Sequence, residues 1–215
     1  MKAVIQKSLL VMACVYLAAC QSAYYNAMEK VGIHKRDILV DRVEKARDAQ
    51  VEAKETFKSA LEEFQTVLNV KRTSLQDQYD AISSEYETAS ESATEVTERI
   101  DAIENVAQAL FKEWQGELEQ YSNRDLKAKS QRKLNATQRK YKKLMTAMRR
   151  AENKMQPVLS ALRDQVLYLK HNLNAQAISS LKGELSGIQG NVTRLVREME
   201  KSIAESEAFI EQLER

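Results

Sequence analysis

The chain has 215 residues, which is enough for one domain of ordinary size. It contains 5 glycines and 1 proline, far below the ordinary usage of about 7% and 5%. This scarcity argues against an all-β sandwich or barrel and against a collagen-like chain, since both need many such residues. Hydrophobic residues make up 43% and charged residues 30%, so a folded helical protein is expected.

Residues 1–19 have the pattern of an export signal. Lys2 and Lys7 precede an apolar stretch that is shorter than the roughly 20 residues needed to span a bilayer. The stretch ends in Leu17-Ala18-Ala19-Cys20, which resembles the lipobox of bacterial lipoproteins. The resemblance implies cleavage before Cys20 and acylation of its thiol, with palmitate among the chains, so that a membrane holds the mature protein. The alternative is an ordinary signal peptide followed by a chance cysteine.

Residues 20–33 are expected to form a lipidated tether that ends near Gly32. Lipobox proteins that stay in the inner membrane usually keep Asp at the second position, whereas Gln21-Ser22 follow Cys20 here. The absence of Asp implies transfer to the outer membrane. We therefore expect the periplasmic face of the outer membrane. Tyr24 and Tyr25 belong either to the headgroup level or to a plain tether.

Residues 34–215 are expected to form one helical coiled-coil domain with arms at about 35–120 and 126–213. From Leu75 to Trp114, apolar residues recur at steps of four and three, which is typical of a coiled-coil seam. Gln50 interrupts the seam earlier in the first arm. Pro157 is expected to kink the second arm or to mark a restart.

Residues 121–125 are expected to form the turn between the arms. Between Thr73 and Glu119 there are 12 acidic and 2 basic residues, whereas Asn123 to Gln156 holds 12 basic and 2 acidic residues. A chain folded back at this turn lays an acidic helix antiparallel to a basic one. Many of these charges fall on outer heptad positions, where each exposed pair contributes little.

The predicted fold class is all-α, with two architectures open. One is a long antiparallel helical hairpin, or coiled coil, and the other is the same hairpin folded back into a three- or four-helix bundle. Weak breaks at residues 69–73 and 172–174 lie roughly opposite each other in the hairpin, and Ser74 and Asp77 resemble a capping box. We favour the elongated hairpin with kinks.

The sequence contains no pattern that predicts catalytic residues, a metal site or a cofactor. Its 2 histidines, His34 and His171, lie in different segments without neighbouring ligands, whereas zinc needs three or four. No phosphate-binding loop and no nucleophile elbow are present. A protein that is not an enzyme is therefore expected.

Basic residues gather between residues 124 and 154, where they would cover the outer face of one helix. The candidate site for an anionic ligand consists of Arg139, Lys140, Lys142, Lys143, Arg149 and Arg150. Such a strip suits an anionic lipid or envelope polymer, and the alternative is neutralisation by the acidic arm. Nucleic acid is not expected, because Tyr141 is the only stacking aromatic within the strip.

Trp114, Tyr121 and Tyr141 lie near the predicted turn. They are interpreted either as packing at the end of the hairpin or as an exposed end for a protein partner. Self-association through exposed seams is also left open by the pattern.

Two segments, Val31–Val43 and Arg163–Ala177, are similar to signature segments of a bacterial envelope family catalogued as domain of unknown function number 2959. The resemblance covers nearly the whole mature chain and implies a helical lipoprotein without an assigned activity. Both histidines lie in these segments, and a folded-back bundle would have a chance of bringing them together.

Three functions are compatible with these observations. The first is a structural or interaction lipoprotein with a protein partner in the envelope. The second is a binding module for an anionic envelope polymer or lipid, and the third is an accessory subunit of an envelope enzyme.

Overall fold

The computed structural model describes residues 24–25, 27–69, 74–172 and 175–214. These residues form the long helices α2 (Lys35–Asn69), α3 (Leu75–Leu118), α4 (Arg124–His171) and α5 (Ala175–Glu214), and they include no strand. The all-α prediction is therefore confirmed. The predicted signal, Cys20 and the first residues of the tether lie outside the described residues.

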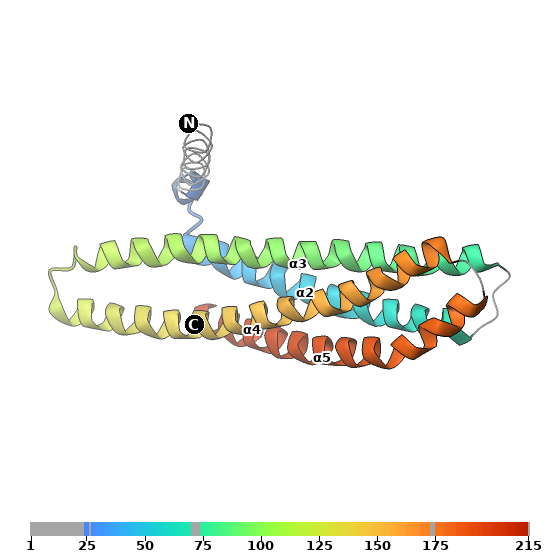
Figure 1. The fold of residues 1–215 in the computed structure, drawn as a ribbon. Coiled ribbons are helices and arrows are strands. Elements are labelled where there is room, and N and C mark those ends of the chain that lie inside the picture. Colours follow the sequence, from blue (N-terminus) through green and yellow to red (C-terminus); the bar gives the residue numbers. More distant parts are fainter. Residues whose placement is uncertain (1–23, 26, 70–73, 173–174, 215) are drawn as a thin grey trace, which may run out of the picture.

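The helices form an antiparallel bundle in which each helix packs against its neighbour in the chain and α5 closes the ring against α2 (Figure 1). Our preference for an elongated hairpin is therefore wrong, and the folded-back alternative is the observed one. The predicted breaks end α2 at Asn69 and α4 at His171. The Ser74 hydroxyl caps α3 by accepting a hydrogen bond from the Asp77 amide at 3.0 Å.

Small residues explain why α2 can contact two neighbours at once. The seam of α2 includes alanines that are at most 8% exposed: Ala46, Ala49, Ala53 and Ala60. Phe57 and Phe64 alternate with them and are almost fully buried. Alanines let the backbones of neighbouring helices approach, while each large side chain contributes roughly 1.5–3 kcal/mol by its burial.

The basic helix α4 is continuous through Pro157, so the restart that was one expectation for this residue does not occur. Its core face carries large side chains, including Leu144, Met148 and Leu162, which are 0–2% exposed. These residues contact the same core as Ile100 and Ile103 of α3.

At one end, α3 and α4 extend beyond the beginning of α2 and the end of α5 (Figure 1). We call residues 114–134 the hairpin tip and the rest of the bundle the body. The turn lies where it was predicted, and the Asn123 side chain begins α4 by accepting hydrogen bonds from the amides of Asp125 and Leu126. Inside the tip the Trp114 indole donates a hydrogen bond of 2.8 Å to Ser130.

Candidate functional site

The predicted cationic residues lie along α4, on the side of the bundle where α4 meets α3 and α5. We call the set Arg139, Lys140, Lys142, Lys143, Arg149 and Arg150 the cationic strip. The structure divides this set into members that have acidic partners and members that do not.

Arg149 is the member held by the acidic helix α3. Its guanidinium lies 2.6 Å from an Asp101 oxygen and 2.9 Å from a Glu104 oxygen, and it also contacts Glu152 of its own helix. Partial burial disfavours the charged form, but the hydrogen bonds to these carboxylates outweigh that effect and raise the pKa of Arg149. Arg149 therefore has a structural role and is the least available member of the strip.

Lys143 and Arg150 are paired with α5, whereas the charge pattern of the sequence pointed to the acidic arm as the source of their partners. The Lys143 ammonium lies 2.7 Å from Glu205, and the Arg150 guanidinium lies 4.0 Å from Glu198. A hydrogen bond from Lys201 lowers the pKa of Glu198, and the charges of the neighbouring arginines add to the effect. Neutralisation of the strip is thus shared between α3 and α5.

Arg139, Lys140 and Lys142 are exposed and have no acidic partner among the described residues. Arg139 and Lys142 line a surface groove of about 440 Å³ between α4 and α5, together with Lys143 and Arg150. Glu198 and Glu205 also line the groove, but they pair with Arg150 and Lys143. An anion there would therefore meet two bases, Arg139 and Lys142, that form no ion pair within the described residues. This arrangement can bind an extended anionic ligand by charge.

The opposite edge of the body, formed by α2 and α3, holds the N-terminal segment, whose described residues are 24–25 and 27–33; we call it the docked segment. Tyr25 is 2% exposed, and Arg42 of α2 donates hydrogen bonds to its hydroxyl at 3.1 Å and to the Ala102 carbonyl of α3 at 2.6 Å. The Arg42 guanidinium also lies over the Tyr25 ring, 5.7 Å from its centre. Tyr25 therefore belongs to the core and is not available to a headgroup layer, whereas Tyr24 is 46% exposed.

A tight turn connects this docked segment to α2. The amides of Gly32 and Ile33 donate to the carbonyls of Glu29 and Met28 at 3.0 Å, which is the Schellman pattern that ends a helix. Gly32 has a φ of +84°, a conformation that favours glycine because a side chain would be strained there. Asp37 then accepts a hydrogen bond from the His34 amide at the beginning of α2.

A pocket of about 270 Å³ lies where the body meets the hairpin tip. Lys35 lies in it between Glu29 of the docked segment and Glu113 of α3, with the Glu113 oxygen at 2.9 Å. The hydrogen bond from Lys35 lowers the pKa of Glu29, and the two carboxylates overcome the cost of burial to raise the pKa of Lys35. Arg36 donates a hydrogen bond to the Leu213 carbonyl and so connects α2 to the end of α5.

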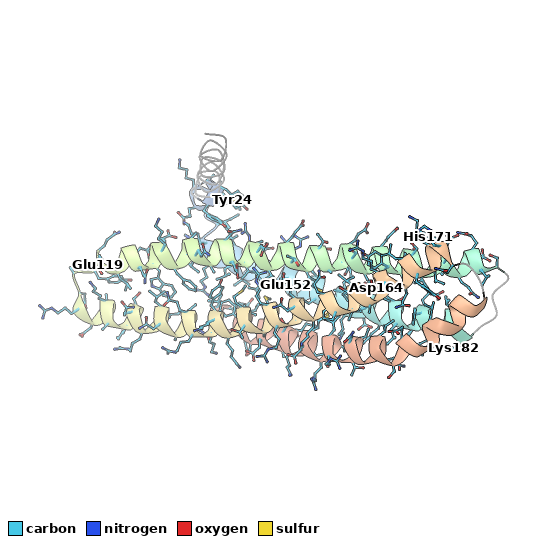
Figure 2. All side chains as sticks on the ribbon, viewed as in Figure 1. Tyr24, Glu119, Glu152, Asp164, His171 and Lys182 are labelled. Atoms are coloured by element: carbon cyan, nitrogen blue, oxygen red, sulfur yellow. The ribbon has the colours of Figure 1, made fainter. Side chains whose placement is uncertain are left out.

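The two histidines lie far apart, so the folded-back bundle does not bring them together. His34 lines the pocket beside Glu113 and Leu213, whereas His171 ends α4 at the other end of the bundle (Figure 2). Antiparallel packing causes this separation, because the beginning of α2 and the end of α4 lie at opposite ends of the body. The described residues include no group of three or more His, Cys, Asp or Glu placed to hold a metal ion.

No helix in the described part of the chain combines the length and apolar content needed to cross a membrane. The fold and site together define an antiparallel all-α bundle with a cationic outer face and a docked N-terminal segment. The chain belongs to the family described as protein of unknown function, DUF2959, whose model matches residues 24–213. Comparison with curated proteins gives no match.

Proposed function

We propose that this protein is a non-catalytic, lipid-anchored binding scaffold of the bacterial envelope, and that it binds an anionic ligand along the cationic strip. The single observation that carries the proposal is the presence of unpaired, exposed bases on α4: Arg139 and Lys142 line the groove, and Lys140 is exposed on the same helix. Acylation at Cys20 and residence on the periplasmic face of the outer membrane are the parts of the proposal that rest on the lipobox resemblance.

The charge of α4 supports this proposal. The helix contains 14 Lys and Arg residues and 3 acidic residues, and only some of these bases find carboxylates on α3 and α5. A polyanion that binds here would release its condensed counterions, so its affinity should fall steeply with added salt. Anionic polymers and anionic lipid headgroups share this chemistry.

Binding of a soluble polyanion tests the proposal directly. The full acylated chain in neutral detergent would be titrated with dye-labelled dextran sulfate at several salt concentrations. Replacing Arg139, Lys140 and Lys142 by Gln should weaken binding about 10- to 100-fold at low salt, since each base near an anionic surface contributes on the order of 1 kcal/mol.

A matched control removes the same charge from another place. Arg163, Lys170 and Lys182 are exposed and have no acidic partner among the described residues, and they lie toward the end of the bundle that is remote from the tip. Their triple replacement by Gln should change the affinity by less than about threefold if only long-range charge is lost. Equal losses for both triple variants would contradict a site on the strip.

The hairpin tip is a second candidate, for a protein partner. Tyr121 and Leu126 are 40% and 51% exposed at the turn. Photo-crosslinking from residue 121 in intact cells should capture one defined envelope protein, and capture should be lost with Leu126→Glu. Capture that is unchanged by this variant would contradict a partner site at the tip.

A further inference from the structure

The two functional edges of the body face in opposite directions. The helices are arranged in the ring order α2, α3, α4, α5, so the α2–α3 edge lies across the bundle from the α4–α5 edge. The N-terminal segment is held at the first edge, through Tyr25, Arg42 and Ala102. The groove of the cationic strip lies at the second edge. In Figure 2, Tyr24 likewise lies on the side of α3 that faces away from α5.

The short connection to the proposed anchor limits how the body can turn. Five residue steps separate Cys20 from the buried Tyr25, and even a fully extended chain covers only about 18 Å in five steps. A helix with its side chains is about 10–12 Å wide, so a path around half of the bundle is roughly 30 Å long. An anchor at Cys20 therefore keeps the α2–α3 edge nearest to the membrane.

The charges favour the same orientation. Helix α3 carries 11 acidic and 2 basic residues. Glu91, Glu95 and Glu98 outnumber Arg99 in a surface hollow that also includes Ala102, next to the docked segment. Anionic headgroups repel such a surface. The cationic strip lies across two layers of helices, roughly 20 Å away, which exceeds two Debye lengths of about 8 Å at physiological salt.

We propose that the anchored protein turns its cationic strip away from its own membrane and uses it to bind an anionic polymer of the envelope, not the lipids that hold it. This inference rests on the proposed function and adds the class of partner. The short connection between Cys20 and the docked segment sets the direction in which the strip faces.

The first test measures polymer binding by the anchored protein. The full acylated chain would be placed in vesicles of phosphatidylcholine alone and in vesicles that also contain phosphatidylglycerol, with dye-labelled dextran sulfate as the probe. The variant with Gln in place of Arg139, Lys140 and Lys142, placed in the same vesicles, reports the general repulsion between anionic vesicles and the probe. After correction for this repulsion, the affinities measured with the two kinds of vesicle should agree within about threefold. A loss of tenfold or more caused by phosphatidylglycerol, with strong binding retained in neutral detergent, would show that the membrane occupies the strip and would overturn the proposal.

The outcome in neutral detergent separates the two levels of inference. If dextran sulfate fails to bind there, the proposed function is overturned and this proposal falls with it. If it binds there and also binds on both kinds of vesicle, both stand. Strong binding in detergent with selective loss on anionic vesicles refutes the orientation alone.

A second test reads the orientation without any ligand. Removal of the signal would leave Cys20 as the only cysteine, and its acylation would make an introduced thiol unique. A fluorophore would be attached at Glu98→Cys on α3 or at Lys140→Cys on α4, both exposed positions where a substitution should not disturb the fold. With a quencher on the lipid headgroups, the label at residue 98 should be quenched several times more than the label at residue 140. Equal quenching, or the reverse order, would overturn the proposal.

Discussion

The body and the hairpin tip use the same two helices but bury them to different extents. In the body, Ile100 of α3 and Met148 of α4 are fully buried in a core to which all of α2, α3, α4 and α5 contribute. In the tip, Leu118 and Leu134 are also buried, but they lie outside that core. The comparison teaches that one heptad seam can serve a four-helix core at one end and a two-helix contact at the other. Stability should therefore be concentrated in the body.

The border between the two regions contains a group of aromatic side chains, in addition to the ion pairs of Lys35 with Glu29 and Glu113. Tyr141 of α4 lies 5.3 Å from Phe111 of α3 and 6.5 Å from Phe209 of α5, measured between ring centres. Burial raises the pKa of Tyr141 to about 12. Because Tyr141 contacts both α3 and α5, it lies where the tip joins the body.

The largest expected effect comes from the core of the body. Phe57 is fully buried in α2, and Phe57→Ala should lower the free energy of unfolding by about 3–5 kcal/mol through lost burial and a residual cavity. Urea denaturation followed by circular dichroism measures this change. Phe57→Leu, which retains most of the apolar volume, should lose clearly less. A loss below about 1 kcal/mol for the alanine variant would contradict the packing of α2 in the body.

A smaller effect is expected at the border, where Lys35 holds Glu29 and Glu113. Lys35→Met keeps most of the apolar stem but leaves both carboxylates without their cation. The free energy of unfolding should fall by about 2 kcal/mol, the size of a hydrogen-bonded charge contact. Hydrogen exchange of residues 27–33 should also become faster. Lys45→Met, which removes the exposed partner of Asp41, should cost less than about 0.5 kcal/mol.

The same ion pair predicts an acid-sensitive step. The pKa of Glu29 is lowered below its ordinary value of 4.5, so folding favours the carboxylate. The resulting stabilisation is fully present above pH 4.5 and is lost as the pH falls through the lowered pKa. The protection factors of the docked segment, which correct for the slower intrinsic exchange in acid, should therefore fall below pH 4.5 in the natural protein, and Lys35→Met should remove most of this step. An unchanged acid step in the variant would contradict the assignment.

A gain in stability is expected at Gln50, a buried polar residue within the body. It is fully buried, and neither atom of its side-chain amide has a hydrogen-bond partner among the described residues. Gln50→Leu removes that cost and should raise the free energy of unfolding by about 1–2 kcal/mol. Gln189→Leu on the exposed face of α5 should stay within about 0.5 kcal/mol. Destabilisation by Gln50→Leu would instead show that the amide supports the register of the bundle.

Much of the fold was predictable because its signals are local. The apolar steps through Ile100 and Ile103, the cap at Ser74 and the turn before Arg124 all follow from short-range patterns, and the structure confirms them. The choice between rod and bundle was not predictable in this way. It depends on whether α2 meets α5, a contact between residues far apart in the sequence, such as Arg36 and Leu213.

The candidate site was predictable only as a set of charges. Periodicity places the bases of the cationic strip on one helix, but their partners depend on tertiary packing. Glu198 and Glu205 of α5 pair with Arg150 and Lys143, although the sequence pointed to the acidic arm for this role. Tyr25 had no pattern to mark it as buried, because its contact with Arg42 crosses from the N-terminal segment to α2.

The smallest effect on global stability is expected in the tip, and it tests the difference between the tip and the body most sharply. Leu118 in the tip and Leu162 in the body are each 2% exposed, so the same Leu→Ala substitution can be compared at equal burial. Leu162→Ala should lower the global free energy of unfolding by about 2–5 kcal/mol. Leu118→Ala should change it by less than about 0.5 kcal/mol, because the tip can open while the body stays folded. Hydrogen exchange should show the loss instead, with reduced protection confined to residues 114–134. If the two variants lower the global stability equally, the tip and the body unfold as one cooperative unit. The contacts of α2 and α5 would then not make the body more stable than the tip.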